Sequence, residues 1–223
     1  MQKFATTAPI AAVLDITAGR VQVIAADRAD ATVEVRPANP SKGRDVKTAE
    51  ETTVTYTDGV LRIETPPAKN SLLGNVGSVE VTVQVPVGSR VEAKAAAAEF
   101  RVVGRLGDVV FDGARGAIKI DEAASVRLTA LDGDVTVGRL GGPAEITTQK
   151  GDIRITEAHG GTVVLSTQSG NVSVDAARGV SASLDAGTTL GRIQNALKNT
   201  EGAAAELAIH ATTVHGDITA RSL

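Results

Sequence analysis

Glycine followed by aspartate or asparagine recurs in the second half of the chain, and these side chains are its best candidates for binding a cation. The pair stands directly before short apolar stretches, at Gly133-Asp134, Gly151-Asp152, Gly170-Asn171 and Gly216-Asp217, with Gly116-Ala117 and Gly191-Arg192 as degenerate members. If successive turns stack, Asp134, Asp152 and Asn171 form a ladder at roughly the 4.8 Å spacing of β-strands. Such a ladder of oxygens suggests calcium, which takes about 6–8 oxygen ligands.

The spacing argues against calcium. In calcium-binding nonapeptide β-rolls an aspartate lies two residues before the buried aliphatic residue in every nonamer. Here Asp134 and Asp152 lie one residue before it, and only in alternate nonamers. Glycine can supply an unusual backbone angle while the neighbouring Asp or Asn bonds to nearby amides, and Lys150 is close enough in sequence to offset the charge. The pattern therefore predicts structural turns without a metal.

Catalytic patterns are equally sparse. Lys150, Asp152 and Arg154 could imitate the charged clusters with which β-helix enzymes act on polysaccharides, but turn chemistry and solubility explain the same residues. The histidines are His159, His210 and His215, without the pair spacing of a zinc site and without any cysteine. No nucleophile elbow, phosphate-binding loop or dinucleotide fingerprint occurs. We therefore expect no catalytic, cofactor-binding or metal-binding residue.

A nine-residue hydrophobic period predicts the elements that position these turns. The apolar residues that open each stretch are Val109, Ile118, Val126, Val135, Ala144, Ile153, Val163 and Val172, separated by 9, 8, 9, 9, 9, 10 and 9 residues. Two nonamers make a unit of about 18 residues that can bury its apolar side only by stacking, as in a β-helix. The expected inward residues are Val126, Leu128, Val135, Val137, Ala144, Ile146, Ile153, Ile155, Val163, Leu165, Val172 and Val174.

The side chains between the inward residues should form outward rows along neighbouring coils. One row is expected to contain Lys119, Thr136, Arg154 and Ser173, and another Arg127, Glu145 and Val164. Arg127 and Glu145 are one coil apart, so they should be neighbours of opposite charge. The rows mix charge, hydroxyl and aliphatic groups, which is typical of solvated faces and not of a flat threonine array.

Residues 1–88 are expected to form antiparallel β-structure that packs on or caps the repeats. Asp27 to Asp30 suits a short hairpin between residues 20–25 and 32–36, and Asp58-Gly59 specifies a two-residue hairpin. Valines alternate with polar residues from Val79 to Val85, which predicts one buried face. Residues 37–49 and 66–77 are expected to be loops, the second a candidate for mobility.

Residues 89–223 are expected to carry the β-helix repeats, in one continuous domain with the N-terminal part. Beyond Ser183 the period lengthens, and residues 195–206 suggest an inserted loop or short helix. Residues 207–211 and 218–220 should form the last coil. The parallel crossovers should be right-handed. The fold class predicted is all-β, a single-stranded parallel β-helix with an antiparallel N-terminal part.

The same residues resemble a known family. The segments Asp132-Gly-Asp-Val-Thr-Val and Lys150-Gly-Asp-Ile-Arg-Ile are similar to the bacterial β-strand-repeat family of unknown function that carries the name "putative adhesin". The ending His215-Gly-Asp-Ile-Thr-Ala-Arg-Ser resembles actinobacterial members, and the resemblance covers nearly the whole chain. It implies a single-stranded β-helix and brings no established catalytic residues.

The composition of the chain limits the classes of function that are expected. The net charge is −3, only four residues are aromatic and there is no cysteine, so a nucleic-acid surface and disulfides are not expected. No stretch approaches the ~18 apolar residues of a membrane span, and we expect a cytoplasmic protein, or a secreted one if an export signal has been removed. We predict a non-enzymatic binding or scaffold module for protein–protein contact that can self-associate through its coil ends. The alternatives are a carbohydrate-active β-helix enzyme and a secreted surface adhesin.

Overall fold

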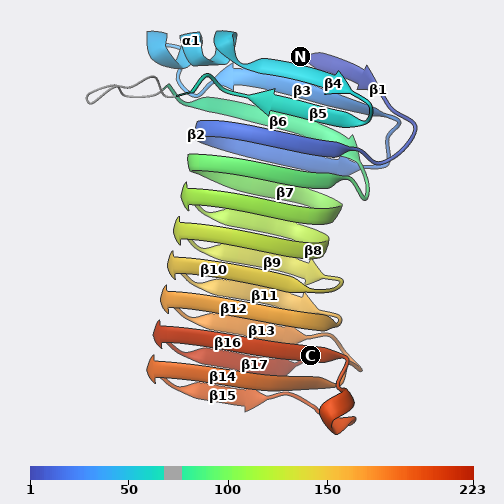
Figure 1. Ribbon diagram of the computed structural model, residues 1–223, viewed down its shortest axis with the longest axis vertical. Helices are drawn as coiled ribbons and strands as arrows, with labels where there is room; N and C mark the ends of the chain where they lie inside the picture. The colour runs from blue at the N-terminus through green and yellow to red at the C-terminus, as the bar shows by residue number, and fades with distance from the viewer. Residues whose placement is uncertain (68–76) are drawn as a thin grey trace. The chain divides into compact units, whose positions relative to one another are not determined.

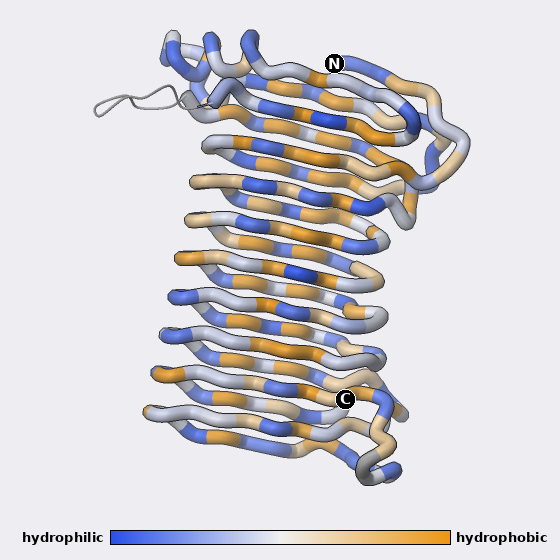
Figure 2. Tube along the Cα trace, in the orientation of Figure 1, coloured by the Kyte–Doolittle hydropathy of each residue, from blue (hydrophilic) through white to orange (hydrophobic). Residues whose placement is uncertain are grey.

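The computed structural model describes residues 1–67 and 77–223 and is built almost entirely from β-strands. The chain divides into two compact units, Met1–Gly116 and Ala117–Leu223. In both units apolar and polar residues alternate along the strands, so that one side of each strand is buried and the other is solvated (Figure 2). The all-β solenoid predicted from the nine-residue period is confirmed.

The first unit contains seven strands and the only α-helix of the described residues. Its elements are β1 (Gln2–Ala5), β2 (Ala11–Ala26), β3 (Asp30–Pro37), α1 (Gly43–Glu51), β4 (Thr53–Thr57), β5 (Val60–Glu64), β6 (Val79–Pro86) and β7 (Arg90–Arg115). The pairs β1–β3, β3–β6 and β4–β5 are antiparallel, as expected for this part of the chain. Strand β2 instead pairs in parallel with β5, β6 and β7. Parallel coiling therefore begins within the first 30 residues, earlier than the sequence indicated.

The expected hairpin at Asp58-Gly59 is confirmed, whereas the one at residues 27–30 is wrong. Asp58 and Gly59 both have positive φ, +50° and +77°, and Thr57 pairs with Val60 across the turn. By contrast β3 pairs with β6, and β6 pairs on its other side with β2 (Figure 1). The valine-rich strand β6 is thus inserted between the two expected hairpin arms, where both of its edges are hydrogen-bonded.

Helix α1 (Gly43–Glu51) covers the second half of residues 37–49, which the sequence predicted to be a loop. The helix buries Asp45 and Thr48 rather than an apolar stripe, so it lacks the hydrophobic period that announces a helix. The Asp45 carboxylate accepts a hydrogen bond from the Ser78 backbone N–H at 3.0 Å, which holds α1 beside the start of β6. The other predicted loop, residues 66–77, lies mostly outside the described residues.

The second unit is a continuous stack of parallel coils. Its elements are β8 (Ile118–Asp132), β9 (Val135–Leu140), β10 (Ala144–Lys150), β11 (Ile153–Ala158), β12 (Gly161–Ser169), β13 (Val172–Ala176), β14 (Ala182–Leu190), β15 (Ile193–Ala196), the 3-10 turn η1 (Gly202–Ala204), β16 (Leu207–His215) and β17 (Ile218–Ser222). Ala144 pairs with Val126 and with Val163, so successive coils are in register. All twelve predicted inward residues are at most 4% exposed, which confirms the coil register.

The order of the last coils differs from the prediction. β16 pairs with β12 on one side and β14 on the other, while β17 pairs with β13 and β15 (Figure 1). The C-terminal strands β16 and β17, here the inserted coil, are therefore next to last in space. The end coil is formed by β14 and β15, which come earlier in the sequence.

The side chains explain this order. Inward residues Leu207, Ile209 and Ile218 of the inserted coil are 0–1% exposed and need cover on both sides. The end coil is less aliphatic, because Ala182 pairs with Leu207 and Asn195 pairs with Ala220. Placing the more aliphatic coil inside and the less aliphatic coil outside buries more apolar surface. The predicted insertion at residues 195–206 contains η1 and connects the two coils.

Candidate functional site

The predicted ladder of turn residues exists, and its oxygens bind the backbone of the neighbouring coil. The Asp152 N–H donates to Asp134 Oδ1 at 2.9 Å, and the Asn171 N–H donates to Asp152 Oδ1 at 2.7 Å. The Asp217 N–H then donates to Asn171 Oδ1 at 2.8 Å, and the Arg192 N–H to Asp217 Oδ1 at 2.8 Å. These five residues form the turn ladder. It follows the spatial order of the coils, so residue 217 precedes residue 192.

Glycine is required beside this ladder for two reasons. Gly133, Gly151, Gly170 and Gly216 have φ between +138° and +156°, a region that side chains rarely adopt. A Cβ on Gly151 would also lie 2.2 Å from the Gly133 carbonyl oxygen of the preceding coil. The turns therefore stack at a distance that only glycine permits, which brings each N–H within reach of the next carboxylate or amide.

The side-chain oxygens of the turn ladder bind the protein's own backbone. Each Oδ1 in the series already accepts a backbone hydrogen bond, and Asp217 also binds the Arg192 guanidinium at 3.1 Å. The backbone and side-chain hydrogen bonds from Arg192 lower the pKa of Asp217. Within residues 1–67 and 77–223, no three His, Cys, Asp or Glu side chains are grouped as metal ligands. The absence of a bound metal stays a prediction.

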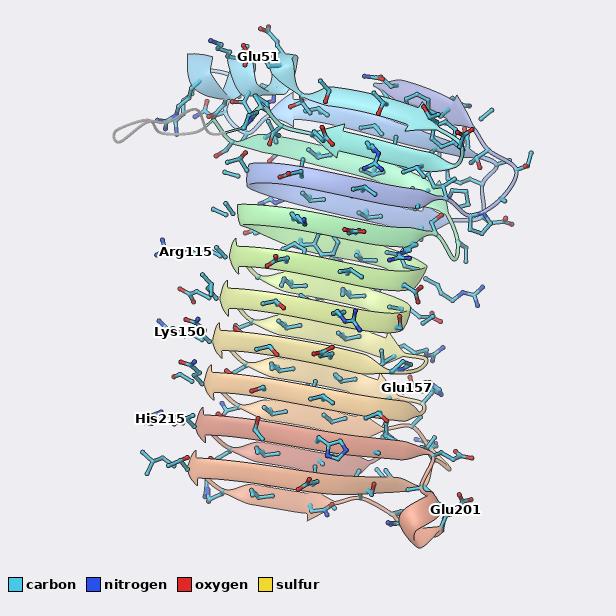
Figure 3. All side chains as sticks on the ribbon, in the orientation of Figure 1. Glu51, Arg115, Lys150, Glu157, Glu201 and His215 are labelled. Atoms are coloured by element: carbon cyan, nitrogen blue, oxygen red, sulfur yellow. The ribbon has the colours of Figure 1, made fainter. Side chains whose placement is uncertain are left out.

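The predicted outward rows are present on the second unit (Figure 3). Arg154 is in register with Thr136 and Ser173, and Glu145 with Arg127 and Val164. Arg127 Nε lies 3.2 Å from Glu145 Oε2, the ion pair expected one coil apart. A second such pair, missed from the sequence, joins Arg139 and Glu157 at 3.2 Å. Both pairs are solvent-exposed, so each is worth at most about 1 kcal/mol.

The histidines are dispersed, although His210 and His215 share β16. His159 Nε2 lies 3.1 Å from Glu157 Oε1, and His210 Nδ1 lies 3.3 Å from Asp185 Oδ2. His210 extends the row of Arg127, Glu145 and Val164, because it pairs with Val164 on β12. The structure thus places His210 beside a carboxylate on the end coil and not in a cluster with the other histidines.

The three charged residues that could imitate a polysaccharide site occupy different environments. Lys150 ends β10 in register with Asp132 and Ser169, Asp152 belongs to the turn ladder, and Arg154 lies in an outward row. Asp152 Oδ1 is occupied by the Asn171 N–H. These separate placements do not group the three side chains into one site.

An ion pair between a buried carboxylate and a half-exposed arginine was missed from the sequence. The Asp175 side chain is 3% exposed, and its oxygens accept hydrogen bonds from Arg221 Nε at 2.8 Å and Nη2 at 2.9 Å. These bonds raise the pKa of Arg221. The pair fastens the inserted coil to β13. The two residues are 46 positions apart and meet only because the inserted coil leaves the sequence order, so the 18-residue repeat could not reveal them.

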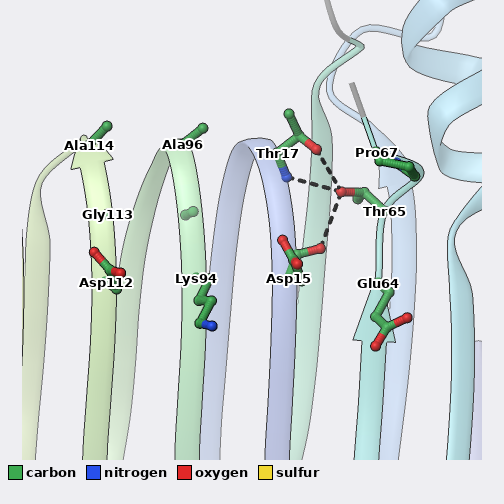
Figure 4. A pocket seen from close by; sticks show the side chains of 11 residues that line it. Asp15, Thr17, Glu64, Thr65, Pro67, Lys94, Ala96, Asp112, Gly113 and Ala114 are labelled. Carbon is green, nitrogen blue, oxygen red and sulfur yellow. Dashed lines mark hydrogen bonds between the residues drawn. The ribbon is translucent and has the colours of Figure 1, made fainter. Parts of the chain in front are cut away.

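The first unit contributes a further row that sequence reasoning did not single out. Asp15 of β2 is in register with Glu64 on β5 and Lys94 on β7. With Asp112 they line an open hollow of about 560 Å³ (Figure 4). Beside them the Thr65 hydroxyl donates to the Asp15 carbonyl and accepts from the Thr17 N–H at 3.0 Å. The hollow is shallow and its acids are not grouped around one point.

These observations define a β-solenoid whose recurring side-chain chemistry is structural: glycine turns, a side-chain ladder and rows of solvated residues. The Toastrack DUF4097 family model matches residues 12–222, and the chain belongs to this family. In the described residues no helix is long and apolar enough to cross a membrane. The sequence matches no curated protein.

The chain is also similar to solved structures of bacterial proteins. A putative adhesin from Parabacteroides distasonis is 16% identical with a TM-score of 0.52, over 100% of this chain and 95% of that one. A putative adhesin from Bacteroides fragilis is 12% identical with a TM-score of 0.48, over 98% and 95%. A putative cell adhesion protein from Clostridium sporogenes is 12% identical with a TM-score of 0.41, over 100% and 98%. The likeness to the first of these shows the fold.

Proposed function

We propose that this protein is a non-enzymatic binding module that serves as a scaffold for contacts with other proteins. One observation carries the proposal, the register of the outward rows in the second unit. Arg127, Glu145, Val164 and His210 succeed one another on the neighbouring parallel strands β8, β10, β12 and β16, and the last three of these strands are paired on both edges. A partner that binds such a face meets side chains on a rigid frame, so little conformational entropy is lost on binding.

The chemistry of the row favours a protein as the partner. It combines an ion pair, an imidazole and an aliphatic side chain, and Val164 is 41% exposed. Mixed polar and apolar groups of this kind are typical of protein surfaces that bind other proteins. The description of the Parabacteroides structure as a putative adhesin is compatible with this use, and a surface adhesin is the form the function would take in an exported protein. For the chain itself we propose a cytoplasmic location, which fractionation of the native host tests.

Face-specific charge reversal tests the proposal. The immobilised full chain is exposed to extracts of the native host, and captured proteins are compared among wild type, Arg127→Glu and Arg154→Glu. Arg127 and Arg154 lie on β8 and β11, on different rows. A partner lost with one variant and kept with the other supports the scaffold function. Capture that neither reversal changes contradicts it.

The same preparation tests the rival class. A carbohydrate-active enzyme should release reducing ends from polysaccharides, and its turnover should fall in Asp152→Asn without loss of folding. Reproducible turnover that this variant abolishes would replace the scaffold proposal with the enzyme. Asn171 occupies the equivalent ladder position, so the substitution leaves the fold in place.

A further inference from the structure

The end coil leaves core positions of the second unit uncovered. Ile193 is in register with Ile218, which is 1% exposed, yet Ile193 itself is 45% exposed. Leu190 at the neighbouring turn is 62% exposed. Among the described strands β14 pairs only with β16, and β15 only with β17. An apolar edge of this kind can bind the strand of another chain.

The chain itself covers only one end of this edge. The Ala182 N–H donates to the Lys198 carbonyl, and the N–H groups of Thr200 and Glu201 donate to the Ser181 hydroxyl. The connection through η1 therefore guards the beginning of β14. Neither lysine nor proline interrupts residues 183–190, the devices that usually protect an edge.

The turn ladder argues against addition of another coil in the same direction. Each coil of the ladder offers a side-chain oxygen to the next N–H, but the end coil has Arg192 at this position. A guanidinium carries donors and no acceptor. A further coil stacked in parallel would place its turn N–H against a cation. Head-to-tail growth into a filament is therefore disfavoured.

A two-fold arrangement avoids this conflict. It reverses the strand direction, so the Arg192 turn of one molecule meets the opposite end of the coil in the other molecule. That opposite end carries exposed Glu201 and Glu206 together with two exposed bases, Lys198 and Arg178. Figure 3 shows Glu201 at the other end of the coils from His215, which pairs with Leu190 beside the Arg192 turn. Arg192 of each molecule is thus brought to the end of the other molecule that carries Glu201.

The strand itself fits such a contact. Asp185 is the only charged residue of β14. An antiparallel register centred on Ala186 sets Asp185 against Gly187 of the second copy, so like charges do not meet. Leu184 then faces Thr188 of the second copy on the core side. Gly187 has no atom within 4 Å of an added Cβ, which leaves room at this point.

We propose that the partner of the end coil is a second copy of this chain, bound through antiparallel pairing of β14 in a closed two-fold dimer. The inference rests on the proposed scaffold function and specifies one of its contacts. It replaces the expected self-association through β16 and β17, because both of those strands are paired on two sides.

Sedimentation and small-angle scattering of the full chain test the proposal, at concentrations up to roughly 500 μM, where even weak specific contacts are populated. Wild type should form a reversible dimer and nothing larger. Ile193→Lys should raise the dimer Kd about tenfold or more, because it buries a charge without a partner. Leu131→Lys is the matched control: Leu131 is 47% exposed but lies on β8, far from the end coil, so this variant should dimerise like wild type.

Two further variants keep the test decisive. Leu190→Lys introduces the same charge at a more exposed residue of the end coil. It should weaken the dimer without disturbing the fold, so the test does not depend on Ile193→Lys folding normally. Glu201→Arg should weaken the dimer, since it removes the complement of Arg192. A monomeric wild type, growth beyond the dimer, or equal effects of Ile193→Lys and Leu131→Lys would each overturn the proposal. Capture of partners by the outward rows is measured on Ile193→Lys, so failure of the dimer is distinguishable from failure of the scaffold function.

Discussion

Replacing Gly151 by alanine should destabilise the protein strongly, because the new methyl group meets two obstacles. The φ of +138° lies where side chains are rarely found, and the Cβ would lie 2.2 Å from the Gly133 carbonyl oxygen. Backbone strain of this kind costs about 1–3 kcal/mol. Relief of the overlap requires the two turns to separate, which lengthens the ladder bond from the Asp152 N–H to Asp134. Loss of that bond to a charged acceptor adds about 1.5–3 kcal/mol.

The sum, about 2.5–6 kcal/mol, is a large part of the stability of a typical domain. In a chain of this size 1 kcal/mol corresponds to about 2–4 °C in Tm, so Gly151→Ala should lower Tm by roughly 5–24 °C. Thermal unfolding followed by circular dichroism, together with urea titration, measures the effect.

The matched control is Gly187→Ala on the end coil. An added Cβ there meets nothing within 4 Å and the backbone is not in the strained region. Its stability should be unchanged or raised by up to about 1 kcal/mol, through the reduced entropy of the unfolded chain. Equal Tm values for Gly151→Ala and Gly187→Ala would refute the reasoning from close turn stacking.

Three other changes test the core, the Asp175–Arg221 pair and the ladder. Ile153→Asp places an unpaired charge among aliphatic side chains and should lower the free energy of unfolding by about 3–5 kcal/mol. Arg154→Asp, on the solvated side of the same strand, should change it by at most about 1 kcal/mol. Similar Tm values for the two variants would contradict the coil register. Asp175→Asn should cost about 1–3 kcal/mol in urea titration, and no loss would mean that the Asp175–Arg221 pair does not fasten the inserted coil. Arg192 lowers the pKa of Asp217, so the carboxylate stabilises the fold fully above the ordinary pKa of 3.8, and this stabilisation is lost as the pH falls through the pKa of the folded state. Asp217→Asn should therefore reduce the fall of Tm at acidic pH. An unchanged fall of Tm would argue against the ladder bond.

The regular part of the fold could be predicted because its signal is local and repeated. Ile153, Val172 and their equivalents recur at nearly constant spacing, and each coil needs the same aliphatic side chains at the same places. The turn ladder followed from the same register, since stacked glycine turns bring Asp134 and Asp152 together. The Arg127–Glu145 pair followed from a separation of one coil.

The irregular part of the fold depends on which distant segments pair with each other, and a repeat period carries no information on this. The sequence order of the coils suggested that β16 and β17 come last. The structure places them inside because Ile209 and Ile218 need cover on both sides, whereas Asn195 tolerates the end position. Helix α1 was missed for a related reason, since it packs through polar groups such as Asp45.

The position of the inserted coil also explains why some residue pairs could not be found from the sequence. Asp175 and Arg221 are 46 residues apart, and the ladder passes from Asn171 to Asp217 and only then back to Arg192. An arginine at a ladder position looked like a degenerate repeat in the sequence. In space Arg192 is the last member of the turn ladder, because no further coil of the described residues stacks on the end coil. The departure from the repeat is therefore informative: Arg192 marks the place where parallel stacking stops and where a contact of another geometry can begin.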